Sequence, residues 1–118
     1  MMKKFFVLIL MFISAVACGQ NAQADKNAVF NPDNVVIDVR SPEEYKAGHI
    51  KNAKNIPVDK IIKDIKTAVP DKEETIVLYC RSGRRSEIAE KTLKEMGYKN
   101  VINAGRYEAL KAQEDKGN

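Results

Sequence analysis

Thiol and imidazole side chains are scarce in this sequence. The chain has two cysteines, Cys18 and Cys80, and a single histidine, His49. Cys18 directly follows an apolar N-terminal run, so Cys80 is the one thiol expected inside the folded part. A thiol with no resolving partner argues against a dithiol oxidoreductase, and one cysteine with one histidine is too few for a structural zinc site. We therefore expect no metal and no cofactor.

A large excess of charge of one sign is also missing. The chain has 20 Lys and Arg against 16 Asp and Glu, a formal net charge of +4. Residues 1–17 contribute two lysines and no acidic residue, so without them the counts are 18 and 16 and the net charge is near +2. Nothing in this balance requires a nucleic-acid partner, and we expect none.

The one long apolar run lies at the N-terminus. Lys3 and Lys4 precede the unbroken run Phe5–Ile13, and small residues follow it. This order is typical of a secretory signal peptide, which we assign to residues 1–17. A retained membrane anchor is the alternative, but the run is short for a membrane span. We expect an exported protein of the periplasm or cell envelope.

Cys18 resembles the lipid-attachment cysteine of bacterial lipoproteins, which also follows the apolar run directly. Ala15 stands three positions before it, where that pattern usually has leucine. We predict lipidation of Cys18, which would be the protein's sole attachment to a membrane. The alternative is a soluble exported protein, cleaved after Ala17 or Ala24.

The remaining chain alternates between strand and helix patterns after a polar tether at residues 18–28. Apolar runs predict strands at 35–39 and 75–79, with shorter ones at 53–56 and 101–102. Helices are expected from a capping box at Ser41 and Glu44, from Asp59, from about residue 85 and from residue 107. The third helix should bury a face made of Ile88, Ala89, Leu93 and Met96. This alternation predicts a single α/β domain over residues 29–118, with a mainly parallel central sheet flanked by helices.

The stretch LYCRSGRRS, residues 78–86, carries the candidate chemistry. It puts Cys80 at the carboxyl end of a predicted strand, where sites form in parallel sheets, followed by Arg81, Arg84 and Arg85. The loop backbone and the start of the next helix should surround an anion, here the thiolate. One cation at about 5 Å adds roughly 3 kcal/mol, or about two pKa units, so we expect a lowered pKa for this thiol. The alternative is an inert buried cysteine beside solvated arginines.

The length of this loop separates two kinds of chemistry. Cysteine phosphatases place five residues between the cysteine and an arginine, and the matching position here is Ser86. The span from Cys80 to Arg85 is one residue shorter, which suits a sulfur atom bound to Cys80 better than a phosphate group. A phosphate- or arsenate-handling enzyme is therefore the disfavoured alternative.

Three stretches together resemble the rhodanese (thiosulfate sulfurtransferase) family, and its small, single-domain, exported members in particular. They are CRSGRRS (80–86), VVIDVRSPEEYKAGHIKNAKNIP (35–57) and EMGYKNVINAG (95–105). The resemblance implies that Cys80 takes a sulfur atom from thiosulfate, releases sulfite and passes the sulfur to cyanide or a thiol. It implies a cradle made of Arg81, Ser82, Gly83, Arg84 and Arg85. We expect a monomer that acts on a small anionic sulfur donor; a sulfur-carrier module with little turnover is the alternative.

Other matches to the family concern supporting residues. Asp38 and Arg40 match its Asp-x-Arg, which we interpret as mainly architectural, with Arg40 paired to Glu43 or Glu44. A direct catalytic role for the pair is the alternative. His49 matches the family's Gly-His-Ile and is interpreted as a structural histidine rather than a base.

The sequence departs from the family after the last strand. A second glycine and then a tryptophan often follow the last strand in the family, whereas here Gly105 precedes Arg106 and Tyr107 and the chain has no tryptophan. We expect Arg106 to reach the mouth of the pocket, where it would influence the choice of donor.

Overall fold

Four parallel strands form one sheet. The strands are β1 (Val35–Asp38), β2 (Lys54–Asn55), β3 (Thr75–Cys80) and β4 (Asn100–Arg106), in the order β2-β1-β3-β4. In the computed structural model, which describes residues 25–117, all three pairings between these strands are parallel. The predicted α/β class with a mainly parallel sheet is confirmed. The carboxyl ends of β1 and β3 meet at one edge, where Asp38 pairs in register with Tyr79, next to Cys80.

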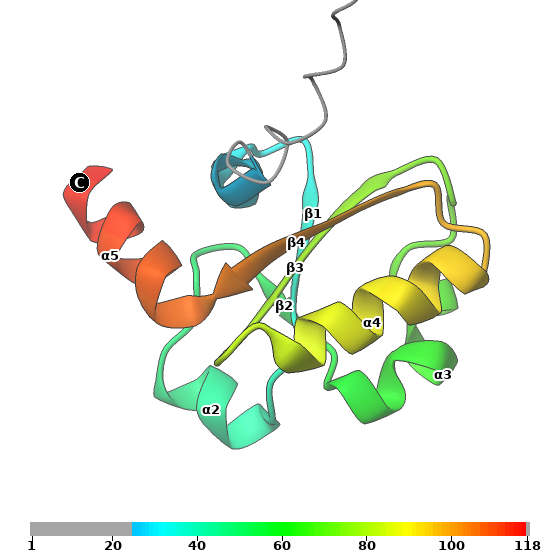
Figure 1. The fold of residues 1–118 in the computed structure, drawn as a ribbon, viewed down its shortest axis with the longest axis horizontal. Helices are drawn as coiled ribbons and strands as arrows, with labels where there is room; N and C mark the ends of the chain where they lie inside the picture. Colours follow the sequence, from blue (N-terminus) through cyan, green and yellow to red (C-terminus); the bar gives the residue numbers. More distant parts are fainter. Residues whose placement is uncertain (1–24, 118) are drawn as a thin grey trace, which may run out of the picture.

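Helices cover both faces of the sheet (Figure 1). On one face, α3 (Ile61–Ala68) and α4 (Arg84–Glu95) pack against alternate strand residues such as Ile37 and Leu78. On the other face, α5 (Tyr107–Gly117) and the 3-10 helix η2 (Asp25–Phe30) cover Val36, Val77 and Ala104. Because side chains of a strand point alternately to either face, β3 is buried on both sides from Ile76 to Cys80.

The short helix α2 (Pro42–Ala47) lies at the sheet edge that carries Cys80. Its predicted capping box is confirmed: Ser41 Oγ accepts the N–H of Glu44, and the Glu44 carboxylate accepts the N–H of Ser41. The helix expected from Asp59 begins differently. A 3-10 turn, η3 (Val58–Lys60), contains Asp59, and α3 starts at Ile61 without a side-chain cap.

The buried face of α4 differs from the predicted one at one position. Ala89 and Leu93 are buried as expected and Met96 packs against the same core, but Ile88 is 49% exposed. The third fully buried residue of the helix is Ser86. Ile88 lies two residues beyond Ser86, about 200° around the helix, so it faces solvent once Ser86 faces the sheet.

The structure describes only part of the N-terminal region that the sequence divides into a predicted signal peptide and tether. The predicted signal peptide, Cys18 and residues 19–24 of the tether lie outside the described residues. Residues 25–28, which were assigned to the tether, belong to η2, where Ala28 and Val29 pack against the core. The folded part thus begins before residue 29. No described helix is both long and apolar enough to cross a membrane.

Candidate active site

The Cys80 thiol lies in a ring of hydrogen-bond donors. Cys80 is the last residue of β3, and Gly83 then turns the chain into α4 with a φ of +94°, a conformation that favours glycine. The turn brings the N–H of Gly83 to 2.9 Å and the N–H of Ser86 to 3.4 Å from Cys80 Sγ. The Ser86 hydroxyl lies 3.5 Å from the same sulfur. The loop backbone can therefore hold an anion at this point.

These donors control the ionisation of the thiol. Burial raises the pKa of Cys80, but hydrogen bonds from the Ser86 hydroxyl and from the N–H groups of Ser86, Gly83 and Ser82 outweigh it, so the net pKa is lowered. The direction agrees with the prediction from sequence, but the cause differs in part. Within residues 25–117, no guanidinium comes within hydrogen-bond distance of Sγ. Arginine charge acts on this thiolate only at longer range.

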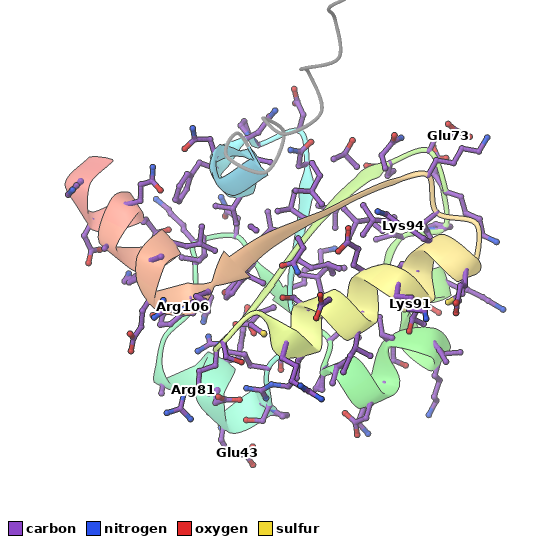
Figure 2. The ribbon with its side chains drawn as sticks, in the orientation of Figure 1. Glu43, Glu73, Arg81, Lys91, Lys94 and Arg106 are labelled. Carbon is purple, nitrogen blue, oxygen red and sulfur yellow. The ribbon has the colours of Figure 1, made fainter. Side chains whose placement is uncertain are left out.

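The three arginines of the loop occupy different surroundings. Arg81 and Arg84 are exposed, and Figure 2 shows Arg81 directed away from the strand end. Arg85 is half-buried, and its Nη1 and Nη2 atoms lie 2.8 and 3.1 Å from the two carboxylate oxygens of Glu44. The predicted cradle residues thus separate into backbone groups at the sulfur, two exposed cations and one cation that is already paired.

Asp38 and Arg40 form a buried ion pair, and the partner predicted for Arg40 was wrong. Arg40 Nη2 lies 2.6 Å from Asp38 Oδ2 and donates to the carbonyl oxygen of Gly48 at 2.7 Å, rather than pairing with Glu43 or Glu44. The backbone N–H of Arg40 also donates to Asp38 Oδ1 at 2.9 Å, so main chain and side chain of Arg40 both bind this carboxylate. The guanidinium packs over the ring of Tyr107, 4.1 Å from its centroid. These contacts support an architectural role.

His49 and Arg106 are placed away from the sulfur. His49 stacks on Tyr45 with 3.7 Å between ring centroids, and its Nδ1 lies 2.9 Å from the Tyr45 carbonyl oxygen. Arg106 is next to Cys80 in the strand register, but its side chain is 59% exposed and points toward Glu108, 3.9 Å away. Figure 2 shows Arg106 at the junction of β4 and α5. The structure therefore does not bring either side chain to the thiol.

Two polar residues near the thiol were missed from sequence. Ser86 Oγ lies 2.8 Å from Asn103 Oδ1 and 3.0 Å from the Gly83 carbonyl oxygen, and Asn103 Oδ1 also accepts the N–H of Gly105. The signal for Ser86 was its place three and seven residues before Ala89 and Leu93, on the apolar face of the helix. A hydroxyl has one proton, so Ser86 can donate to Asn103, to Gly83 or to the sulfur, but to one of them at a time.

We expect Ser86→Ala to raise the pKa of Cys80. The variant removes one donor to the thiolate, and a hydrogen bond to an ionised group is worth about 1.5–3 kcal/mol. The ratio of thiolate to thiol at a given pH should then fall by roughly tenfold or more. The pH dependence of iodoacetamide alkylation measures this directly, with Ser82→Ala, an exposed side chain in the same loop, as the control. An unchanged alkylation profile in Ser86→Ala would contradict the assigned role.

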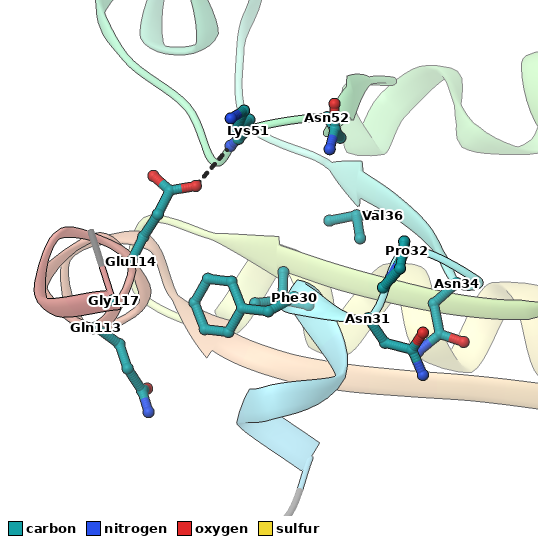
Figure 3. A pocket seen from close by; sticks show the side chains of 11 residues that line it. Phe30, Asn31, Pro32, Asn34, Val36, Lys51, Asn52, Gln113, Glu114 and Gly117 are labelled. Carbon is teal, nitrogen blue, oxygen red and sulfur yellow. Dashed lines mark hydrogen bonds between the residues drawn. The ribbon is translucent and has the colours of Figure 1, made fainter.

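A separate cavity of about 580 Å³ lies at the other end of the sheet. It is bounded by η2, by the segment that leads into β1, and by Glu114 near the end of α5, which accepts the Lys51 N–H at 2.9 Å (Figure 3). Cys80 is not part of its lining. Among residues 25–117, no cluster of three or more His, Cys, Asp or Glu side chains could hold a metal ion.

Known proteins resemble this chain in both sequence and fold. Residues 20–113 match the family described as rhodanese-like domain. The chain is 46% identical over 81 residues to the thiosulfate sulfurtransferase PspE of Escherichia coli (strain K12), an alignment that covers 69% of this chain and 78% of that one. It is 39% identical over 89 residues to a putative mitochondrial thiosulfate sulfurtransferase of Schizosaccharomyces pombe, covering 66% of this chain and 63% of that protein.

A solved structure agrees with these matches. A structure described as a rhodanese with anions from E. coli superposes with a TM-score of 0.62 at 47% sequence identity, over 64% of this chain and 88% of the other. The family match spans most of the chain and includes the Cys80 loop, the buried Asp38–Arg40 pair and all four strands. The chain belongs to the rhodanese-like domain family.

Proposed function

We propose that this protein is a thiosulfate sulfurtransferase that carries sulfur as a persulfide on Cys80. The observation that carries the proposal is the ring of donors around Cys80 Sγ, which stabilises an anionic sulfur at a strand end. The two relatives whose names include thiosulfate sulfurtransferase support thiosulfate as the donor. The thiolate is the form that attacks sulfur, and the lowered pKa of the Cys80 thiol increases the fraction in this form.

The first half of the reaction loads the thiolate. Cys80 Sγ attacks the outer sulfur of thiosulfate and forms a new S–S bond. The bond between that sulfur and the sulfite group breaks, and its electron pair leaves with sulfite. No external oxidant is needed, because the transferred sulfur arrives already at the sulfane oxidation level. The N–H groups of Gly83 and Ser86 lie 2.9 and 3.4 Å from Sγ. We expect them to donate to the outer sulfur as well, once that atom carries the negative charge.

The second half returns the free thiolate. A nucleophilic acceptor, cyanide or a thiolate, attacks the outer sulfur of the persulfide and forms thiocyanate or a new persulfide. The electron pair of the broken S–S bond returns to Cys80 Sγ. The same hydrogen-bond donors stabilise this leaving thiolate, so a single set of groups serves both halves of the cycle.

The exposed cations near the loop favour a doubly charged donor. Arg81 and Arg84 are both exposed, and neither forms an ion pair with another residue in the described range. Thiosulfate brings two negative charges, whereas mercaptopyruvate brings one carboxylate. Long-range attraction should therefore favour thiosulfate and weaken with added salt, since screening acts over about 10 Å at 0.1 M.

Intact-mass measurement tests the proposal. Incubation with thiosulfate should add the mass of one sulfur atom, and subsequent cyanide should remove it while thiocyanate appears. Repeated cycles at constant protein concentration then distinguish an enzyme from a sulfur carrier with little turnover. A protein that gains no mass with thiosulfate, or whose added mass cyanide cannot remove, would overturn the assignment.

A further inference from the structure

Glu44 and Arg85 form a two-point ion pair beside the Cys80 loop. Glu44 comes from α2 and Arg85 from the first turn of α4, so the pair connects two elements that are 41 residues apart in sequence. Both carboxylate oxygens are engaged by the guanidinium, at 2.8 and 3.1 Å. The N–H and hydroxyl of Ser41 donate to the same carboxylate at 3.0 and 3.1 Å. Glu44 is thus held in one position by four hydrogen bonds.

This carboxylate is charged throughout the working pH range. The Arg85 hydrogen bonds lower the pKa of Glu44 to about 2, although burial opposes them. The pair therefore contributes no net charge near the loop. Of the three arginines that follow Cys80, only Arg81 and Arg84 remain without a carboxylate partner within residues 25–117, and both are exposed to screening by solvent.

We propose that Glu44 is a specificity-determining residue: by cancelling the charge of Arg85, it limits the advantage that doubly charged sulfur donors have over singly charged ones. The inference rests on the proposed function, because it concerns the donor that loads Cys80. It predicts that the charge of Glu44, rather than its shape, decides between donors. Glu44 acts here through the field around the loop and does not need to touch the donor.

The variant Glu44→Gln separates charge from shape. Glutamine keeps the length of the side chain and can replace glutamate in a capping box, so α2 should be retained. If the donor binds about 8 Å from the carboxylate, removing this charge in water changes the Coulomb energy between residue and dianion. The change corresponds to roughly a threefold to tenfold difference in rate. We expect kcat/KM for thiosulfate to rise by roughly that factor at low ionic strength. For benzenethiosulfonate, a monoanionic sulfur donor, the rise should be about the square root of it, because the energy scales with donor charge.

Glu43→Gln is the matched control. Glu43 lies in the same helical turn, is exposed, and forms no ion pair with any described residue; Figure 2 shows it directed away from the domain. The variant makes the same change in net charge without releasing Arg85. The ratio of thiosulfate to benzenethiosulfonate rates should stay within about twofold of wild type in Glu43→Gln. The larger ratio of Glu44→Gln should fall back toward wild type at 1 M salt, where the Debye length is about 3 Å.

Two further variants, Arg85→Ala alone and Arg85→Ala combined with Glu44→Gln, test whether the charge of Glu44 affects the donor. Arg85→Ala leaves the Glu44 carboxylate unpaired near the path of an anionic donor, so kcat/KM for thiosulfate should fall by roughly threefold to tenfold. Adding Glu44→Gln to Arg85→Ala restores the charge balance and should recover most of the loss. A double variant as slow as Arg85→Ala would overturn the inference. So would a Glu44→Gln protein whose two donor rates fall equally.

The proposed function is checked independently in the same proteins. Sulfur loading of Cys80 is measured by intact mass in wild type and in Glu44→Gln, and loading that is lost in a folded Glu44→Gln protein alone would refute the role of Glu44. Absence of loading in wild type refutes the function, whereas normal loading with an unchanged donor ratio refutes the role of Glu44 alone. Thermal unfolding of each variant shows whether α2 and the loop remain folded.

Discussion

Replacing Cys80 by serine is expected to abolish sulfur loading and to lower thiosulfate:cyanide activity by on the order of a thousandfold or more. A hydroxyl at this position cannot be ionised by hydrogen bonds of this kind, and it forms no persulfide. Cys80 is the last residue of β3 and the only cysteine among residues 25–117, so no other thiol of the described chain can replace it. Serine is smaller and polar, and the same N–H groups can bond its oxygen.

Two measurements on this variant decide the assignment. Mass spectrometry after thiosulfate treatment should show no added sulfur, and thermal unfolding should remain close to wild type because the N–H groups of Gly83 and Ser86 keep a partner. Cyanide-dependent turnover at the wild-type rate in a folded Cys80→Ser protein would refute Cys80 as the nucleophile. Cys80→Ala repeats the test without any hydroxyl in the loop.

The backbone geometry of the Cys80 loop could be predicted from sequence because it depends on local residue order. A cysteine at a strand end, a glycine three residues later and a helix start after that leave few ways to direct the N–H groups. The observed φ of +94° at Gly83 and the bond from its N–H to Sγ follow from that order. A short motif is enough to predict a geometry that the local backbone alone determines.

The partners of the arginines could not be predicted in the same way. Glu43 and Glu44 both follow Arg40 within about one helical turn, and this local spacing favoured an ion pair between Arg40 and one of the two glutamates. In the structure, Asp38 is closer to Arg40 across the strand end, and Glu44 pairs with Arg85 from a distant helix. Which carboxylate meets which guanidinium depends on how α2 packs against α4. That packing is a tertiary property that no local pattern records.

The burial of Ser86 is a second feature that local sequence patterns did not predict. Burial patterns in sequence favour apolar residues, so Ile88 was assigned to the core and Ser86 was not. The structure exposes Ile88 and buries Ser86, whose N–H and hydroxyl lie 3.4 and 3.5 Å from Cys80 Sγ. A polar residue therefore takes a buried position in the first turn of α4, and the predicted apolar face holds from Ala89 onward.

Asp38→Ala should produce the largest loss of stability, about 3–5 kcal/mol in the free energy of unfolding. Asp38 is fully buried and Arg40 is 4% exposed, so the variant leaves a guanidinium inside the domain with its carboxylate removed. The remaining bond from Arg40 to the Gly48 carbonyl oxygen and the contact with the Tyr107 ring offset only part of that cost.

Urea denaturation compares Asp38→Ala with an exposed pair as control. Glu90→Ala breaks the ion pair between Glu90 and Lys94 on the outer side of α4, and an exposed pair of this spacing is worth about 0.3–0.5 kcal/mol. Adding Arg40→Met to Asp38→Ala removes the unpaired charge and should restore a large part of the lost stability, since an apolar replacement of a buried pair is often close to neutral. If Asp38→Ala unfolds at the same urea concentration as Glu90→Ala, the buried pair does not stabilise this edge of the sheet. If instead the double variant is less stable than Asp38→Ala, Arg40 stabilises the edge through its contacts with Gly48 and Tyr107 rather than through its charge.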